Sequence, residues 1–247
     1  MRPDHLSTSH YTEDTFFDGR LNVRQKADGY RFSLDAVILA WHVTPASGAK
    51  IVDIGTGCGI IPLILTYRYG TVTVTGLEIQ PGLAALAREN AAANGMEQRI
   101  TILCEDITQA AARLPAGLSD LVVCNPPFRK AADGRINPNP ERAIARHEIK
   151  TTLAEIIAAA GRLLRTSGDF VAIYSTTRLT DIVSALRQGN IEPKELRMIH
   201  SRANDPARLL LIKGKKNARP GITVPAPFII YNDDGSYTAE AKKMFAP

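Results

Sequence analysis

Cysteine is scarce in this sequence, and its few occurrences do not form a recognisable site. The 247 residues include only Cys58, Cys104 and Cys124. None belongs to a C-x-x-C pair, so the pattern gives no support for a zinc site, and we expect no metal. Each lies within or beside an apolar segment, which is typical of a buried free thiol in a reducing compartment.

Long apolar runs are also absent. No stretch approaches the ~20 apolar residues that a transmembrane helix needs, and no apolar segment follows the polar N-terminus as in a secretory signal. Internal repeats and low-complexity tracts are lacking as well. Hydrophobic residues nevertheless make up 45% of the chain, enough for a large core. We therefore expect a soluble cytoplasmic protein that does not bind a membrane.

From Lys50 onward, apolar strand-like runs alternate with helical segments. We expect strands at 51–54, 72–77, 100–104, 121–124 and 170–174, and helices at 60–69, 83–93, 152–164 and 178–187. Two further segments, 195–199 and 207–213, are expected to form a final antiparallel pair. Such alternation predicts a mostly parallel sheet with helices on both faces. Upstream, Asp18-Gly19 predicts a turn between two short strands, and Ser33 is a candidate N-cap for a helix.

A glycine-rich loop follows the first strand of this repeat. Gly55, Gly57 and Gly59 lie between a strand and a helix, where glycine lets a ligand approach the backbone. A dinucleotide-binding fingerprint would need its third glycine at position 60, which is Ile60. The spacing from Asp53 through the three glycines instead resembles the S-adenosylmethionine (SAM) loop of class I methyltransferases.

Acidic residues follow the next two strands. Glu78 ends the second strand, about 25 residues after Asp53, where an acid typically binds ribose hydroxyls. Asp106 follows the third strand, and by resemblance to SAM-dependent enzymes it would bind the adenine amino group. Asp before a helix is also a common N-cap, so this alternative stays open.

The run Asn125-Pro126-Pro127-Phe128 follows an apolar strand and offers a receptor for a planar amine. The Asn125 side chain and the Pro126 carbonyl can accept two N–H bonds, and Phe128 can stack on a ring. These bonds would draw the nitrogen toward tetrahedral geometry and aim its lone pair at a methyl donor. No strong base is required, because an alkylated amine loses its proton readily, so we assign His147 no role as a base.

These motifs identify a resemblance that extends from about residue 29 to 240. The sequence resembles the bacterial tRNA(Val) adenine-37 N6-methyltransferases and the wider group of Asn-Pro-Pro-Phe/Tyr amino-methyltransferases. The segments that carry it are 28–35, 53–59, 125–128 and 146–148. It implies a Rossmann-like α/β class I SAM-dependent methyltransferase with a seven-stranded sheet. It also implies SAM as cofactor, S-adenosyl-L-homocysteine as product, tRNA as substrate, and no obligate protein partner.

The resemblance and the motifs together give a set of candidate site residues. We expect cofactor contacts from Tyr30, Ser33, Asp35, Asp53, Gly55, Thr56, Gly57, Gly59, Glu78, Asp106 and Asn125. The catalytic residues would be Asn125, Pro126, Pro127 and Phe128. A formal net charge of +5 favours an anionic partner. We expect RNA contacts from Arg129, Lys130, Arg146, His147, Lys215 and Lys216.

The same motifs leave alternatives open. The Asn-Pro-Pro-Phe run specifies chemistry rather than substrate, and enzymes that methylate release-factor glutamine, guanine N2 or DNA adenine share it. A small-molecule amine, or a noncatalytic module that binds SAM or RNA, also remains. We divide the chain into an extension at 1–45 that covers the cofactor site, a methyltransferase domain at 46–214 and a basic tail at 215–247 packed on that domain.

Overall fold

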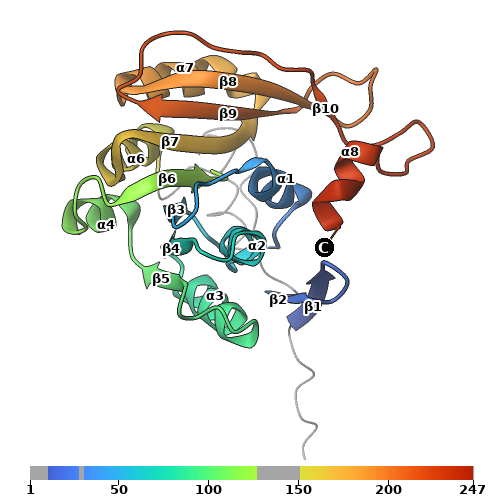
Figure 1. Ribbon diagram of the computed structural model, residues 1–247, viewed down its shortest axis with the longest axis horizontal. Coiled ribbons are helices and arrows are strands. Elements are labelled where there is room, and N and C mark those ends of the chain that lie inside the picture. Colours follow the sequence, from blue (N-terminus) through green and yellow to red (C-terminus); the bar gives the residue numbers. More distant parts are fainter. Residues whose placement is uncertain (1–10, 28–30, 127–150, 247) are drawn as a thin grey trace, which may run out of the picture.

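A sheet of eight strands forms the middle layer of the computed structural model, which describes residues 11–27, 31–126 and 151–246 (Figure 1). Its order is β10-β8-β9-β7-β6-β3-β4-β5, and β9 alone runs antiparallel to its neighbours. The strands are β3 (Lys50–Ile54), β4 (Thr73–Glu78), β5 (Ile100–Cys104), β6 (Ser119–Cys124), β7 (Leu164–Ser175), β8 (Ile191–His200), β9 (Leu209–Lys216) and β10 (Phe228–Ile229). The mostly parallel sheet and the antiparallel pair are confirmed. The two-residue β10 is an additional strand beyond the seven expected.

Helices cover both faces of the sheet, and each face has its own apolar cluster. One face carries α1 (Leu34–His42), α2 (Ile60–Arg68) and α3 (Pro81–Ala93). The other carries α4 (Ile107–Arg113), α6 (Leu153–Leu163) and α7 (Leu179–Gln188), which follows the short helix η1 (Thr176–Arg178). No helix in the described ranges is long and apolar enough to cross a bilayer.

The sequence predicted no helix at the position of α4, whereas the bounds of α6 agree closely with the helix predicted at 152–164. In the seven residues of α4, Ile107 is followed by the polar pair Thr108 and Gln109 and then by three alanines, so the segment shows little apolar periodicity. By contrast, α6 starts with a capping box in which Thr152 and Glu155 satisfy each other's backbone N–H groups. Short helices without such a signal depend on tertiary packing, here of α4 against α6.

A separate two-stranded hairpin, β1 (Tyr11–Phe16) and β2 (Leu21–Lys26), packs beside α3. The predicted turn at Asp18-Gly19 is present, with positive φ at both residues. Asn94, the C-cap residue of α3, exchanges two hydrogen bonds with the backbone of Asn22, at 2.9 and 2.7 Å. An asparagine side chain thus replaces a neighbouring strand along this part of β2.

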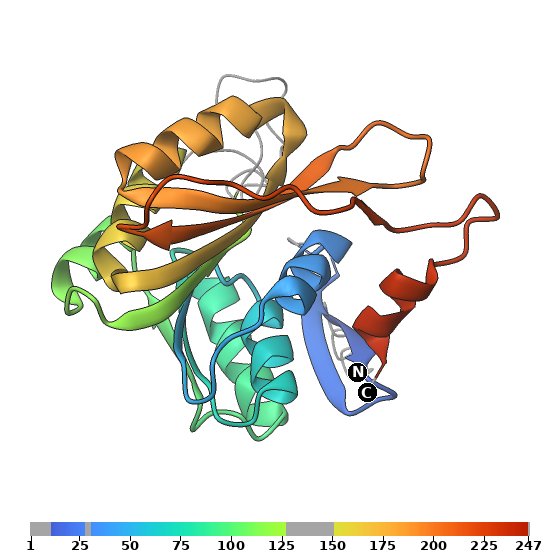
Figure 2. The same ribbon diagram turned by 45° about the horizontal axis from the view of Figure 1, so that its top comes forward.

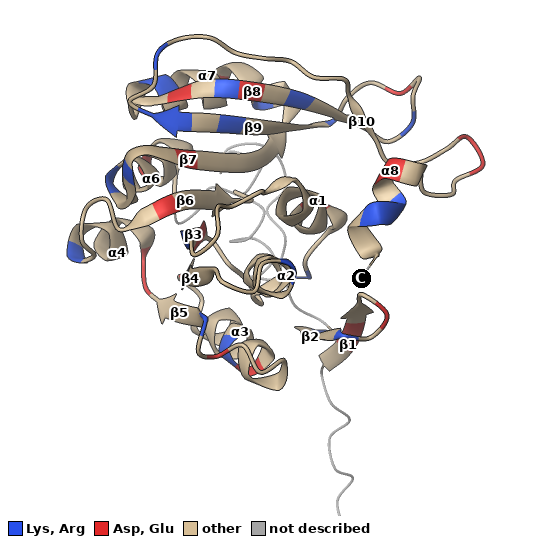
Figure 3. Ribbon diagram, in the orientation of Figure 1, with Lys and Arg blue, Asp and Glu red and all other residues tan. Residues whose placement is uncertain are grey.

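The chain after β7 places many basic residues at one end of the sheet. β9 continues through Lys216, so Lys215 and Lys216, the first residues of the expected tail, belong to a strand. Figure 3 shows blue at the tip of β9, on the side away from the loop that joins β8 and β9. Since β9 runs opposite to β7, that tip lies at the amino ends of the parallel strands.

A strap at 217–227 follows the outer edge of β8. The backbone carbonyl of Thr223 accepts a hydrogen bond from Leu196 N, and its backbone N–H donates one to Lys194 O, both at 2.9 Å. The chain then forms β10, α8 (Ala239–Lys242) and the short helix η2 (Lys243–Phe245). Figures 1 and 2 both show this C-terminal end beside the β1–β2 hairpin.

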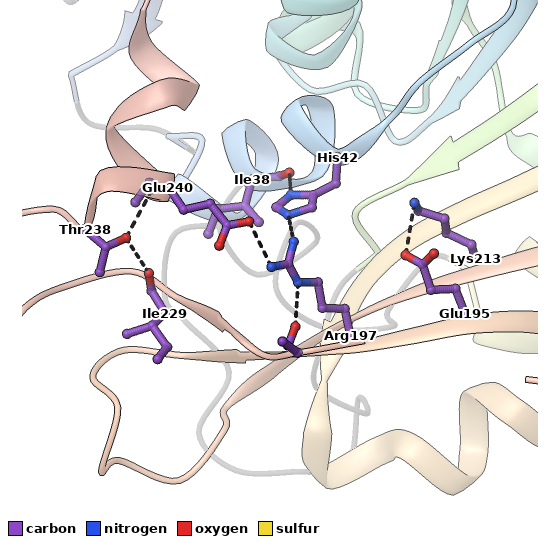
Figure 4. A network of polar contacts seen from close by, with 10 residues as sticks. Ile38, His42, Glu195, Arg197, Lys213, Ile229, Thr238 and Glu240 are labelled. Atoms are coloured by element: carbon purple, nitrogen blue, oxygen red, sulfur yellow. Dashed lines mark hydrogen bonds and ion pairs between the residues drawn. The ribbon is translucent and has the colours of Figure 1, made fainter. Parts of the chain in front are cut away.

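Arg197 on β8 joins the C-terminal segment to α1 (Figure 4). Its guanidinium donates to Ala226 O at 2.9 Å, to Glu240 Oε1 at 2.8 Å and to His42 Nε2 at 3.1 Å. Since arginine only donates, His42 accepts at Nε2, and its Nδ1–H donates to Ile38 O at 2.8 Å. Burial lowers the pKa of His42 to about 4, which agrees with a neutral ring.

Candidate cofactor and acceptor site

The candidate site lies at the carboxyl ends of the parallel strands, where the chain changes direction around β3. From β3 the sheet continues to β4 and β5 on one side and to β6 and β7 on the other. Ile54 lies opposite both Leu77 of β4 and Cys124 of β6. The next residue of each strand belongs to the same edge, and these residues are Gly55, Glu78 and Asn125. Ligands of open α/β sheets bind at such a switch point.

The glycine loop turns sharply over the end of β4. Gly55 N and Thr56 N both donate to Leu77 O, at 2.9 and 3.0 Å. Gly59 has a φ of 89°, and a Cβ there would lie 3.2 Å from the Cβ of Ala87 on α3. The third glycine is therefore needed both for the turn into α2 and for the close approach of α3.

Glu78 is fixed against this loop by two backbone amides. Its Oε2 accepts from Gly57 N at 2.9 Å, and its Oε1 accepts from Gln80 N at 2.8 Å. The side chain is buried, with 6% of its surface exposed. The carboxylate thus connects the glycine loop to the start of α3 and presents negative charge at the sheet edge.

Asp53 is the most unusual acid of the site. It is fully buried in β3, and neither carboxylate oxygen has a hydrogen-bond partner among the described residues. The Thr56 hydroxyl is buried without a partner as well. Burial raises the pKa of Asp53 to about 7, and the nearby Glu78 carboxylate adds to this. An unpaired buried carboxyl beside a glycine cradle fits a ligand that carries an amino group, as SAM does.

Asp106 acts as a helix cap. Its Oδ1 accepts from Thr108 N at 2.8 Å and from Thr108 Oγ1 at 2.5 Å. The hydrogen bond from the Thr108 side chain holds the pKa of Asp106 below its usual range. The capping alternative from the sequence is therefore observed, and the contact with an adenine amino group stays a prediction.

Ser33 and Asp35 lie at the N-terminal end of α1. Ser33 occupies the N-cap position, but its side chain makes no capping bond to the helix backbone. Burial raises the pKa of Asp35 in the first turn. The far end of α1 is His42, which lines a cavity of about 210 Å³ with Asp120 and Leu121 at the amino end of β6. A role of Ser33 and Asp35 in cofactor binding stays a prediction.

The acceptor motif begins directly after β6. Asn125 is half-buried and Pro126 is buried. The preceding Cys124 is buried, its Sγ donates to Ile54 O at 3.5 Å, and burial raises its thiol pKa, so the thiol is a structural link between β6 and β3. The other candidates lie outside the described residues: Tyr30, Pro127, Phe128, Arg129, Lys130, Arg146 and His147.

Lys215 and Lys216 are not brought to this edge. Lys215 pairs with Asp169 at 2.7 Å and donates to Ser167 O at 3.1 Å. Lys216 donates to Leu164 O at 2.7 Å. Both lie at the amino ends of the parallel strands, because β9 runs opposite to β7 (Figure 3). They are therefore separated from the acceptor motif, and their contact with RNA stays a prediction.

Asn90 is a structural residue of the site that the sequence prediction missed. It is fully buried on α3, and its Nδ2 donates to Cys58 O at 2.9 Å and to Arg24 O at 3.0 Å. Its Oδ1 accepts from Arg24 N at 2.9 Å. The side chain ties the glycine loop to β2. Asn90 and Asn94 are one turn apart in an alanine-rich helix, and asparagine has low helix propensity, so this pair was the available signal.

Comparisons with known proteins agree with this geometry. Residues 33–187 match the family described as "Methyltransferase small domain". A curated tRNA1(Val) (adenine(37)-N6)-methyltransferase from Porphyromonas gingivalis strain W83 is 32% identical, covering 95% of this chain and 94% of that protein. The corresponding Aeromonas hydrophila protein is 27% identical, covering 86% and 87%.

Solved structures are similar in fold. A "predicted O-methyltransferase" from Agrobacterium tumefaciens aligns with a TM-score of 0.71 at 22% identity, covering 85% of this chain and 94% of that one. Geranyl diphosphate C-methyltransferase from Streptomyces coelicolor, in complex with Mg²⁺, geranyl diphosphate and S-adenosyl-L-homocysteine, aligns with a TM-score of 0.55 at 12% identity, covering 85% and 90%. These likenesses concern the fold, whereas the matches above concern the family. The chain therefore belongs to the methyltransferase small domain family and, within it, to the family of tRNA1(Val) (adenine(37)-N6)-methyltransferases.

Proposed function

We propose that this protein is a SAM-dependent methyltransferase that modifies N6 of adenine 37 in tRNA1(Val), acting in the cytoplasm. The observation that carries the proposal is the alignment of Gly55, Glu78 and Asn125 at one edge of the sheet, beside the unpaired carboxyl of Asp53. A cofactor subsite and an amine receptor would then share one edge of the sheet. The name of the 32% identical relative supports the choice of tRNA.

The cofactor subsite is proposed from the chain's own donors and acceptors. Asp53 would accept from the amino group of SAM, while the glycine loop leaves room for the ligand. Glu78 would bind ribose hydroxyls, and Asp106 the adenine amino group. Tyr30, Ser33, Asp35 and Thr56 would complete the set. When bound, SAM supplies a methyl group already activated by its sulfonium.

The acceptor subsite orients an exocyclic amine. Asn125 Oδ1 would accept one N–H of the target amine, and the Pro126 carbonyl would accept the other. Both bonds favour a tetrahedral nitrogen, whose lone pair is then no longer conjugated with the ring and points toward the methyl group. Pro127 and Phe128 would hold the ring by packing and stacking. The transfer gains mainly from orientation and from exclusion of water, and the proton leaves the alkylated nitrogen without a dedicated base.

The N-terminal part of the chain would cover the cofactor. We propose that residues 1–45 form this cover, because β2 is tied through Asn90 to Cys58 of the glycine loop. The domain at 46–214 would carry the chemistry, and the C-terminal segment would support α1 through Arg197.

A product assay tests this function. Purified protein is incubated with labelled SAM and either an unmodified tRNA1(Val) transcript or a bacterial release factor, and the product is digested and identified. N6-methyladenosine at position 37 supports the proposal. Labelled glutamine in the release factor, or N2-methylguanosine in the RNA, contradicts it and favours another planar amine as substrate.

Asn125→Ala is the matched test of the acceptor role. This variant should still bind SAM but lose about 10²–10³-fold in kcat, a much larger loss than any in SAM affinity, because one polarising acceptor is gone. SAM affinity is measured by calorimetry and turnover by methyl incorporation into tRNA. A variant with near wild-type turnover would show that Asn125 does not hold the amine.

A further inference from the structure

Most arginine side chains in the described part of the chain are engaged by neighbours. Arg113 pairs with Glu105 at 2.6 Å and Arg165 with Asp120 at 2.6 Å, and Arg162 donates to carbonyl groups at the end of α4. Such contacts hold the guanidinium groups in place and satisfy part of their donor capacity.

Two arginines of one loop differ from this pattern. Arg202 and Arg208 lie in the loop 201–208 between β8 and β9, and both are exposed. Neither side chain makes a hydrogen bond or ion pair with any residue in the described ranges. Arg20 in the hairpin turn and Arg219 in the strap are also exposed arginines without a side-chain partner in the described ranges, but each is the single such arginine of its segment.

The loop 201–208 lies at the same edge of the sheet as the candidate site (Figure 1). β9 is antiparallel to both β7 and β8, so β8 runs in the direction of β7 and ends at the carboxyl edge. Thr176, directly after β7, donates its N–H to Arg208 O at 3.1 Å and its hydroxyl to Ala207 O at 2.9 Å. The loop is therefore anchored next to the strand that neighbours β6 and Asn125.

The sheet register gives the separation between the loop and the acceptor motif. Cys124 pairs with Ala172, so Asn125 is level with Ile173, whereas Arg208 is level with Thr176. The two residues are offset by three residues along the strands, about 10 Å, and by two strand spacings across the sheet, also about 10 Å. Together these offsets place the Arg208 backbone about 14 Å from that of Asn125. An RNA with its target base beside Asn125 would therefore carry phosphates of nearby nucleotides across this loop.

The backbone of the loop is held before any partner binds. Asp205 N donates to Arg202 O at 3.1 Å, and the His200 ring contacts Asp205 O at 2.7 Å. Tyr231 N donates to Ser201 O at 2.9 Å, which ties the loop to the segment after β10. Because the backbone of the loop is already ordered, it loses little backbone entropy when the two arginine side chains bind a ligand.

We propose that Arg202 and Arg208 bind phosphates of the RNA substrate and so form part of its docking surface. This inference rests on the proposed function and adds where the RNA lies. The guanidinium fork matches phosphate oxygens, and these two arginines have no ion pair with a described residue that they would give up to bind them. The edge is not uniformly basic, because Asp205 lies in the loop and Asp233 in a following turn. The contact is therefore assigned to the two arginines rather than to a broad basic patch.

The test compares two double variants with equal loss of charge. Arg202→Ala with Arg208→Ala removes the proposed contacts. Arg165→Ala with Arg187→Ala is the control, since both arginines are exposed and ion-paired, with Asp120 and Glu192 respectively. Binding of an unmodified tRNA1(Val) transcript is measured by fluorescence anisotropy over a range of salt concentrations, and SAM affinity and melting temperature are recorded for each protein.

The loop variant should weaken tRNA binding about 10-fold at moderate salt and reduce the slope of log K against log salt by about 1.4 to 1.8, as expected for two phosphate contacts. Its KM for tRNA should rise while kcat at saturating tRNA and SAM affinity stay near wild type. The control variant should keep the wild-type slope.

The outcomes separate this proposal from the proposed function. An unchanged slope in the loop variant, or an equal fall in the control, overturns the docking surface even if adenine 37 is methylated. A wild-type protein that does not bind the transcript also overturns it. If the slope falls as expected but the product assay finds no N6-methyladenosine, the docking surface stands and the assigned reaction fails.

Discussion

Asp53 should release a proton when SAM binds. Its carboxyl group is buried without a hydrogen-bond partner in the part of the chain that the structure describes, and its pKa is raised from 3.8 to about 7. That shift corresponds to about 4 kcal/mol disfavouring the ionised form in the ligand-free protein. An ammonium group placed beside the carboxyl would reverse the preference, because an opposite charge at hydrogen-bond distance favours the carboxylate.

The size of the effect follows from the titration curve. At pH 6.5 a group with a pKa of about 7 is about three-quarters protonated, so binding should release about 0.7 proton per SAM. SAM affinity should rise about fivefold between pH 6 and pH 7, because the fraction of ionised Asp53 rises from about 0.1 to about 0.5. Calorimetry at pH 6.5 in two buffers of different ionisation enthalpy measures the released proton directly.

Two variants make the result specific. Asp53→Asn should bind SAM more weakly and release no proton at pH 6.5. Asp106→Asn should keep the release, because the pKa of Asp106 is already held low by its Thr108 contact. If the wild type binds SAM at pH 6.5 with no buffer-dependent enthalpy, Asp53 is not the partner of the amino group and the reasoning is refuted.

Two more predictions concern stability. Burial lowers the pKa of His42 to about 4, so the stability that its neutral ring contributes is complete above pH 6.5 and falls by about 3 kcal/mol as the pH drops toward 4. Urea unfolding of the wild type and of His42→Gln at pH 7 and pH 5 should therefore show a smaller pH dependence of stability in the variant. An equal pH dependence in the two proteins would contradict this role of His42. Asn90→Ala should lower the free energy of unfolding by about 2–4 kcal/mol, because the buried carbonyl of Cys58 and the partly buried N–H and C=O of Arg24 lose their bonds to Asn90. The same variant should weaken SAM binding. The Asn94 side chain bonds the backbone of Asn22 in β2 and of Asn90 in α3, so Asn94→Ala should leave SAM affinity near that of the wild type.

Much of the sheet could be predicted because its strands are covered on both faces and therefore read as short apolar runs. The strand at 51–54 and the glycine loop after it were predicted in this way. The strand at 121–124 was predicted likewise, and with it the position of Asn125 at the same edge of the sheet as the glycine loop. Helix α4 was missed because its seven residues have almost no apolar periodicity. The position of Lys215 and Lys216 at the amino ends of the parallel strands could not be read from the sequence, because it depends on β9 running opposite to β7.

Other properties of the site depend on contacts between distant segments. That Asp53 has no hydrogen-bond partner within 11–27, 31–126 and 151–246 reflects its three-dimensional surroundings, and a sequence that reads Val-Asp-Ile gives no sign of it. The role of Asn90 depends on contacts with two distant segments, because it lies 66 residues from Arg24 of the hairpin and 32 residues from Cys58 of the glycine loop. The engagement of Asp106 by Thr108 was foreseeable, because an acid two residues before a helical threonine is a common cap.

The strap at 217–227 has a consequence for the behaviour of the protein at high concentration. It occupies the outer border of β8, where an uncovered strand would offer its backbone to another molecule. The strap contains Pro220 and Pro225, which have no N–H to donate, so its own outward side is a poor template for another β-strand. Intermolecular sheet growth is therefore blocked at this border, and a chain shortened to end at Lys216 should self-associate.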